Sequence, residues 1–176
     1  MEFEPAGLDG AWVLHLDRRE DERGFFARVW CADEFQRRGL NPALAQGSLS
    51  YNHSSGTLRG MHYQAAPAQE AKVVRCVRGA IHDVLIDVRR ESPTYRKWIA
   101  RELTADNRLS FYVPEGVAHG FLTLSDGAEV LYLISAAHAP ELARGVRWND
   151  PAFNVEWPRP PAVISERDRS YPDFAA

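Results

Sequence analysis

Four side chains in this sequence have the types and spacing needed to move a proton beside a carbonyl group. His62 and Arg59 lie in the stretch GTLRGMHYQ (56–64), which has the composition of a β-strand. Lys72 opens the next predicted strand, and Tyr132 lies on an apolar strand further along the chain. A neutral imidazole can accept a proton near pH 7, an ammonium can stabilise an enolate oxygen, and a phenol can return a proton.

These side chains must be positioned by strands, whose residues alternate between two faces. Alternation within 57–64 predicts that His62 and Arg59 point to opposite faces, unless a β-bulge re-aims one of them. Lys72 shares its face with Val74, where a buried ammonium needs a partner. Taken singly, each residue also fits a structural role: a core histidine, a lysine reaching solvent from a strand end, or a buried tyrosine with a bonded hydroxyl.

Short segments rich in β-branched and aromatic residues recur along the chain, separated by turn-forming residues. We predict strands near 10–17, 24–30, 46–52, 57–64, 71–78, 80–88, 94–103, 109–113, 117–124 and 128–135. Helical periodicity predicts a short helix over 32–38, ended by Gly39, and a further turn near 164–169. The charged segment 18–23 is expected to be a solvated turn. Regularly spaced short strands indicate a sandwich or a barrel.

This pattern leaves a jelly roll, an immunoglobulin-like sandwich and an up-and-down barrel open. The motif P-x-G-x-x-H at 114–119, followed by a strand, is similar to the second half of a cupin signature. Cupins are small jelly-roll barrels whose inward side chains form a site. We therefore expect an all-β, cupin-type jelly-roll β-sandwich or barrel with a few short helical turns, forming a single domain over 1–176.

Composition narrows the class of protein. The chain has 176 residues, 45% apolar and 26% charged, with a formal charge of −3, which argues against nucleic acid as a partner. No apolar run approaches the ~18 residues of a membrane helix, and the N-terminus lacks signal-peptide features, so no membrane partner and a cytoplasmic location are expected. Cys31 and Cys76 show no zinc or disulfide spacing and are expected to be buried free thiols.

From about residue 21 to 168, the chain resembles the dTDP-4-dehydrorhamnose 3,5-epimerase family, nucleotide-sugar epimerases of the cupin superfamily. Many ordered motifs carry this resemblance, which makes it far more specific than any single motif. The matching segments are 21–26 (DERGFF), 56–64 (GTLRGMHYQ), 71–79 (AKVVRCVRG), 92–93 (SP), 114–121 (PEGVAHGF), 131–132 (LY), 144–148 (RGVRW), 150–151 (DP) and 165–168 (SERD).

The resemblance implies epimerisation at C3, C5 or both of a nucleotide-linked 4-keto-6-deoxyhexose by a homodimer. It implies that His62 is the base, held by Asp168, and that Lys72 lies near the enolate oxygen. Tyr132 would be the acid on the opposite face of the sugar. The expected substrate-binding residues are Arg23, Phe26, Gln46, Ser48, Arg59, His119, His138 and Arg167.

Family members place their N-terminal segment on the partner subunit, so Arg23 and Phe26 are expected to serve the partner's site. Because epimerisation moves protons without a redox change, no cofactor is expected. In agreement, no G-x-G-x-x-G opens a helix after a strand.

The chain departs from the family at four positions that contact substrate in its relatives. Arg28 stands where the family has glutamate, Ser48 where it has asparagine, His138 where it has tyrosine, and Ala143 where it has glutamate. The proposed catalytic set is complete, but the binding shell is changed. Another nucleotide, another sugar, or inversion of a single carbon therefore stays open.

Two other classes of protein compete with this interpretation. His62, Gln64, Glu70 and His119 fall near cupin metal-ligand spacing, and two histidines with a carboxylate could hold Fe(II) or Mn(II). Gln64 replaces the usual second histidine, which weakens this alternative, and no metal is expected. A non-catalytic sugar-nucleotide binder is the other alternative, against which the complete set of His62, Lys72, Tyr132 and Asp168 argues.

Overall fold

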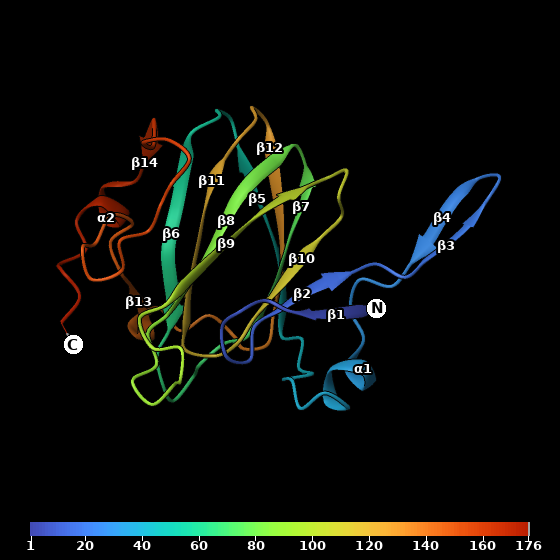
Figure 1. Ribbon diagram of the computed structural model, residues 1–176, viewed down its shortest axis with the longest axis horizontal. Coiled ribbons are helices and arrows are strands. Elements are labelled where there is room, and N and C mark those ends of the chain that lie inside the picture. The colour runs from blue at the N-terminus through green and yellow to red at the C-terminus, as the bar shows by residue number, and fades with distance from the viewer. Residues whose placement is uncertain (176) are drawn as a thin grey trace.

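Two β-sheets pack face to face and enclose a core of apolar side chains (Figure 1). The computed structural model describes residues 1–175. In hydrogen-bonded order, the first sheet contains β1 (Glu2–Pro5), β2 (Trp12–His15), β10 (Ser110–Val113), β7 (Lys72–Arg78), β12 (Ala128–Ile134) and β5 (Gln46–Asn52). The second contains β13 (Ala143–Gly145), β6 (Thr57–Gln64), β11 (Val117–Thr123), β8 (Ala80–Asp87) and β9 (Trp98–Thr104). The predicted all-β, cupin-type jelly roll is confirmed.

Smaller elements attach to the sandwich at its two sides. The hairpin of β3 (Arg18–Asp21) and β4 (Gly24–Ala27) extends beyond the sheets, followed by α1 (Ala32–Gln36) (Figure 1). At the opposite side of the view, β14 (Val163–Ile164) pairs in parallel with β6 and leads into α2 (Glu166–Arg169). A 3-10 turn, η1 (Pro140–Leu142), precedes β13. Within residues 1–175, no helix has the length and apolar character needed to cross a bilayer.

The core between the sheets follows from strand alternation. Val74 of β7 and Val130 of β12 point inward from the first sheet, and Ile81, Leu85 and Phe121 meet them from the second. All five side chains are essentially inaccessible to water. Burial of such side chains contributes roughly 1.5–3 kcal/mol each, so this core holds the two sheets at a fixed separation. The sheets can therefore act as a rigid frame for the polar side chains that line the space between them.

The outer faces of both sheets are also partly covered. Phe35 of α1 packs on the first sheet beside Tyr112 and Leu14. Val84 and Ile86 of β8 pack on the far side of the second sheet under the C-terminal segment, which includes Phe153. This double coverage explains why β8 is apolar on both faces rather than alternating.

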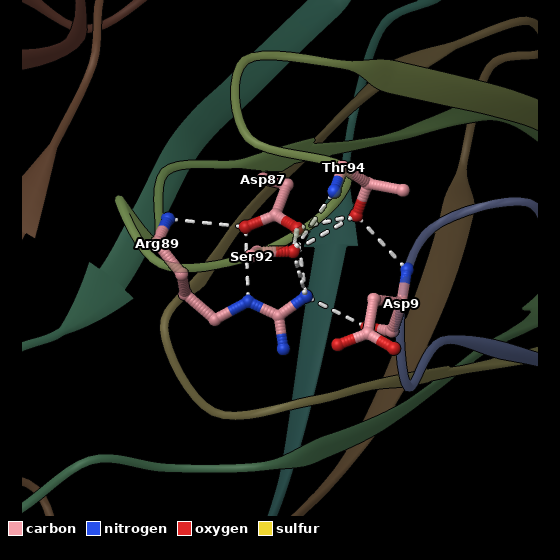
Figure 2. A network of polar contacts seen from close by, with 5 residues as sticks. All are labelled: Asp9, Asp87, Arg89, Ser92 and Thr94. Carbon is pink, nitrogen blue, oxygen red and sulfur yellow. Dashed lines mark hydrogen bonds and ion pairs between the residues drawn. The ribbon is translucent and has the colours of Figure 1, made fainter.

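A buried polar network fixes the connection between β8 and β9 (Figure 2). Asp87 accepts hydrogen bonds from the Arg89 guanidinium at 2.7 and 2.9 Å and from the hydroxyls of Ser92 and Thr94. Arg89 also donates to the backbone oxygen of Asp9 at 2.7 Å, in the turn between β1 and β2. The network therefore ties the two sheets together at one end.

Most predicted strands are found within a few residues of their expected bounds, but some expectations were wrong. The segment 94–103 begins as a turn, because Arg96 has a positive φ of 64°, and β9 starts at Trp98. Residues 18–21, expected to be a solvated turn, form β3, although all four are exposed. The short strands β1, β13 and β14 were not predicted, since two to four residues carry little periodicity.

The two expected helical segments are present in shortened form. The helix expected over 32–38 ends at Gln36, and Gly39 follows it with φ of 69°. The turn expected near 164–169 is α2, whose N-cap Ser165 accepts a hydrogen bond from the Asp168 backbone N–H at 3.1 Å. Cys76 is buried as expected, and burial raises the pKa of its thiol to about 11. Cys31 is only partly buried, which corrects the expectation for that residue, because it lies at the exposed start of α1.

Candidate active site

A cavity of about 770 Å³ lies between the sheets and is lined by strands of both sheets and by α2. It gathers side chains that are far apart in sequence. The predicted site residues that line it are His62, Tyr132, Asp168, Lys72, Gln46, Ser48, Arg59, His119, His138 and Arg167. Alternation along β5 points Gln46, Ser48 and Ser50 toward the cavity, and the two small hydroxyl side chains leave it room.

A bulge in β6 corrects the expected orientation of Arg59. His119 of β11 pairs with His62, but Phe121 pairs with Arg59, so β6 has one extra residue between these pairs. The extra residue reverses the alternation, and both Arg59 and His62 line the cavity while Met61 is buried on the other side.

A glycine is required at this bulge. Gly60 has φ of 131°, and an ideal Cβ there would lie 2.5 Å from the Cα of Gly120. Only a residue without a side chain allows β6 and β11 to approach so closely.

His62 is paired with a buried carboxylate. Its Nε2 lies 2.6 Å from Oδ1 of Asp168, whose other oxygen accepts the Gly60 backbone N–H at 3.2 Å. Burial opposes ionisation of Asp168, but hydrogen bonds from His62, Gly60 and Ser165 and the charge of His62 outweigh it, so the pKa of Asp168 is lowered. The carboxylate stays ionised at neutral pH, and its hydrogen bond with Nε2 fixes the orientation and tautomer of the imidazole.

Lys72 is held by two acceptors inside the cavity wall. Its Nζ lies 2.9 Å from Oε1 of Glu70 and 3.4 Å from the backbone oxygen of His62. The side chains of Lys72 and Glu70 are 8% and 12% exposed, so this is a nearly dry ion pair. Because an ammonium has three N–H bonds, these contacts leave one for an oxygen in the cavity.

Tyr132 of β12 and His119 of β11 form a second cluster in the cavity wall. Their ring centroids are 5.9 Å apart with the rings nearly perpendicular, and His119 Nε2 lies 2.8 Å from Oδ1 of the fully buried Asp83. Burial, reinforced by the negative charge of Asp83, raises the pKa of Tyr132 well above its ordinary value, and Arg59 partly opposes this. The phenol is therefore fully protonated across the neutral pH range.

The cavity has an excess of positive charge. Its lining includes the cations Arg59, Lys72, Arg144 and Arg167 but only the carboxylates Glu70 and Asp168. Arg59 is oriented by Asn52, whose side-chain oxygen accepts its Nε–H at 2.8 Å. This charge favours an anionic ligand such as a diphosphate.

The structure does not bring Arg23 and Phe26 to this cavity. They lie on the β3–β4 hairpin, where the Arg23 side chain is 82% exposed and Phe26 is 76% exposed. Among the departures from the family, Ser48, His138 and Ala143 line the cavity. Arg28 lies elsewhere and pairs with Glu34 at 2.9 Å.

Each residue of the competing metal set has another partner. His62 is bonded to Asp168, His119 to Asp83, and Glu70 to Lys72. The Gln64 amide bridges the backbone of residues 68, 137 and 139 and so joins two loops. In the part of the chain that the structure describes, no three His, Cys, Asp or Glu side chains are grouped so as to hold a metal ion.

Sequence reasoning missed three residues of the site. Glu70 was considered only as a metal ligand, although its position two residues before Lys72 could have suggested an ion pair at the strand entrance. Arg144 was noticed only within a matching motif, and Asn52, which is 1% exposed, was not singled out. A buried asparagine at a strand end is the signal that could have drawn attention to its hydrogen-bonding role.

Comparison with known proteins gives one consistent result. The model of the family described as dTDP-4-dehydrorhamnose 3,5-epimerase matches residues 5–176. The dTDP-4-dehydrorhamnose 3,5-epimerase of Sinorhizobium fredii is 41% identical over 99% of this chain and 90% of its own. The dTDP-4-dehydrorhamnose 3-epimerase of Streptomyces niveus is 38% identical over 96% of this chain and 82% of its own.

A solved structure agrees with these sequence relatives. The crystal structure of dTDP-4-dehydrorhamnose 3,5-epimerase from Bacillus anthracis, with TDP and PPi bound, superposes with a TM-score of 0.93 at 32% identity. The match covers 98% of this chain and 99% of that one. Together with the family match over nearly the whole sequence, this shows that the chain belongs to the dTDP-4-dehydrorhamnose 3,5-epimerase family.

Proposed function

We propose that this enzyme inverts C3 and C5 of a dTDP-linked 4-keto-6-deoxyhexose, with His62 as base and Tyr132 as acid. The observation that carries the proposal is that an imidazole backed by an ionised carboxylate and a protonated phenol line one cavity. The excess of cations in that cavity suits the diphosphate of a nucleotide sugar. The Bacillus anthracis relative was crystallised with TDP and PPi, which also supports a dTDP-linked substrate.

The chemistry follows from the ketone at C4, which acidifies the protons on both neighbouring carbons. His62 removes one of these protons, and Asp168 stabilises the imidazolium that forms. The electron pair moves to the C4 oxygen, where the free N–H of Lys72 stabilises the enolate. Tyr132 then protonates carbon from the other face and inverts it. Exchange with solvent returns the proton to Tyr132 and removes the extra one from His62, so no redox cofactor takes part.

We also propose that the enzyme is a homodimer in which the β3–β4 hairpin completes the partner's site. Phe25 and Phe26 are exposed on this hairpin, and Leu49, Tyr51 and Val77 are exposed on the first sheet. Large apolar side chains gathered on an edge strand and a projecting hairpin favour burial against a second copy. The free thiols of Cys31 and Cys76 support a location in the reducing cytoplasm.

The proposal is tested by incubating the enzyme in D₂O with dTDP-4-keto-6-deoxyglucose and following deuterium by NMR. We expect deuterium at both C3 and C5, and loss of exchange by about 10²-fold or more in His62→Asn. His15→Asn, a histidine outside the cavity, is the matched control and should retain wild-type exchange. No exchange by the wild-type enzyme, or rapid exchange by His62→Asn, would contradict the proposal.

A second candidate is inversion at C3 alone, since the Streptomyces niveus relative is a 3-epimerase. The same experiment separates the two, because a mono-epimerase would introduce deuterium at only one carbon.

A further inference from the structure

Tyr171 follows α2, and its side chain lies beside His62, the proposed base. An ideal Cβ on Gly145 would lie 2.3–2.7 Å from atoms of the Tyr171 ring and hydroxyl, so the ring occupies the space that a side chain at position 145 would fill. Gly145 is the strand partner of His62 in the pairing of β13 with β6. The Tyr171 ring consequently lies next to His62, with centroids 6.3 Å apart and the rings inclined at 66°.

The main chain at Tyr171 is held in place as well. Arg147 donates to the backbone oxygen of Tyr171 at 3.3 Å and pairs with Asp173 two residues later. Two separate contacts, one to the ring and one to the backbone, therefore fix this tyrosine relative to β13 and β6.

The hydroxyl of Tyr171 contacts an arginine of the cavity wall. Arg167 Nε–H donates to the Tyr171 hydroxyl at 3.0 Å, and its guanidinium carbon lies 6.0 Å from the centre of the ring. Arg167 lines the cavity, although as a residue of α2 it is largely exposed to solvent. A long exposed side chain loses conformational freedom when it binds a ligand, and prior orientation reduces that loss.

The hydrogen bond between Arg167 Nε and Tyr171 leaves the two terminal nitrogens of the guanidinium available to bind a ligand. The two terminal nitrogens of a guanidinium carry four N–H bonds, in the planar arrangement that matches two oxygens of a phosphate. Tyr171 thus engages the one nitrogen of Arg167 that such a bidentate contact does not need.

We propose that Tyr171 is a positioning residue that orients Arg167 toward the diphosphate of the nucleotide-linked substrate. This inference rests on the proposed function, because it takes the ligand to be a nucleotide sugar. Tyr171 acts through Arg167 and does not contact the reacting carbons. Its hydroxyl therefore affects binding of the nucleotide part, and its ring keeps the wall beside His62 closed.

The test is a double-mutant cycle on dTDP binding, measured by isothermal titration calorimetry at fixed ionic strength. Tyr171→Phe keeps the ring and removes the hydroxyl, so we expect dTDP affinity to fall about threefold to tenfold. KM for the 4-ketosugar should rise by the same factor while kcat stays within about twofold. In the Arg167→Ala background, Tyr171→Phe should have no further effect, because the residue through which it acts is gone.

Tyr95→Phe is the matched control. The Tyr95 hydroxyl is buried, has no hydrogen-bond partner among residues 1–175 and lies outside the cavity, so its removal should leave dTDP affinity unchanged. Unchanged affinity in Tyr171→Phe, or additive losses in the double variant, would overturn the inference while the proposed function stands. A wild-type enzyme that neither binds dTDP nor exchanges deuterium would overturn both.

Discussion

His62 Nε2 and Asp168 Oδ1 lie 2.6 Å apart although 106 residues separate them in the sequence. Asp168 reaches this position from the first turn of α2, and β14 holds that turn against β6, the strand that carries His62. The pairing therefore depends on a C-terminal segment that adds only a two-residue strand to the sheet.

Replacing Asp168 by asparagine should slow proton abstraction with little loss of structure. The amide is nearly isosteric but cannot stabilise an imidazolium, so we expect deuterium exchange at C3 and C5 to fall by about 10²-fold. Ser165→Ala is the comparison variant, because it removes the α2 cap and the weakest of the hydrogen bonds to Asp168 but keeps the carboxylate and its contact with His62. It should reduce stability by about 1 kcal/mol and change exchange far less. Equal exchange rates in Asp168→Asn and the wild type would rule out this role.

The sequence was sufficient for the longer strands and for the side chains whose orientation follows from simple alternation. Lys72 on β7 and Tyr132 on β12 point where period-two counting predicts. Arg59 does not, because the bulge beside Gly60 depends on how closely β6 and β11 approach, which is a tertiary property.

Contacts between residues far apart in the sequence also could not be predicted from local sequence patterns. Asp168 entered the site through family resemblance, since nothing near residue 168 indicates a histidine 106 positions away. No local pattern marked Tyr171, because its ring fills the space left by the absent side chain of Gly145, which is on another strand. The β3 strand was missed because its residues are all exposed and charged, so no hydrophobic alternation marks it.

Glu70 is expected to affect catalysis through Lys72. Glu70→Gln removes the charge that holds the ammonium at 2.9 Å, so the third N–H of Lys72 should lose its fixed direction. We expect kcat to fall about tenfold with KM nearly unchanged, because enolate stabilisation is realised in the transition state. Glu115→Gln, a carboxylate bonded to Asn41 outside the cavity, is the matched control. A rise in KM at constant kcat would instead assign Glu70 to substrate binding.

The proposed exchange of hairpins between subunits predicts complementation. Arg23→Ala and His62→Asn should each inactivate a homodimer. A refolded equimolar mixture should recover about a quarter of wild-type activity, since half of its dimers are mixed and each of these has one intact site. His62→Asn mixed with Tyr132→Phe is the control, because both residues line the cavity of one chain and every site would stay defective. Absence of recovery in a confirmed mixed dimer would show that the hairpin serves its own chain or none.

The Asp87 network predicts a pH-dependent contribution to stability. Burial opposes ionisation of Asp87, but hydrogen bonds from Arg89, Ser92 and Thr94 outweigh it, so the pKa of Asp87 is lowered in the folded state. A carboxylate whose pKa is lowered by folding stabilises the protein fully when the pH is above its pKa in the unfolded state, about 3.9. That stabilisation is lost as the pH falls through the pKa of the folded state.

Asp87→Asn should therefore reduce the free energy of unfolding by about 3 kcal/mol at pH 7, because it leaves the Arg89 charge without its buried partner. The difference between variant and wild type should shrink as pH falls below about 4, where wild-type Asp87 itself becomes protonated. Urea denaturation at a series of pH values measures both quantities. Glu20→Gln, in an exposed pair with Arg18, should show a much smaller difference at every pH. A difference that stays constant down to pH 2 would mean that the Asp87 charge does not stabilise the connection between β8 and β9.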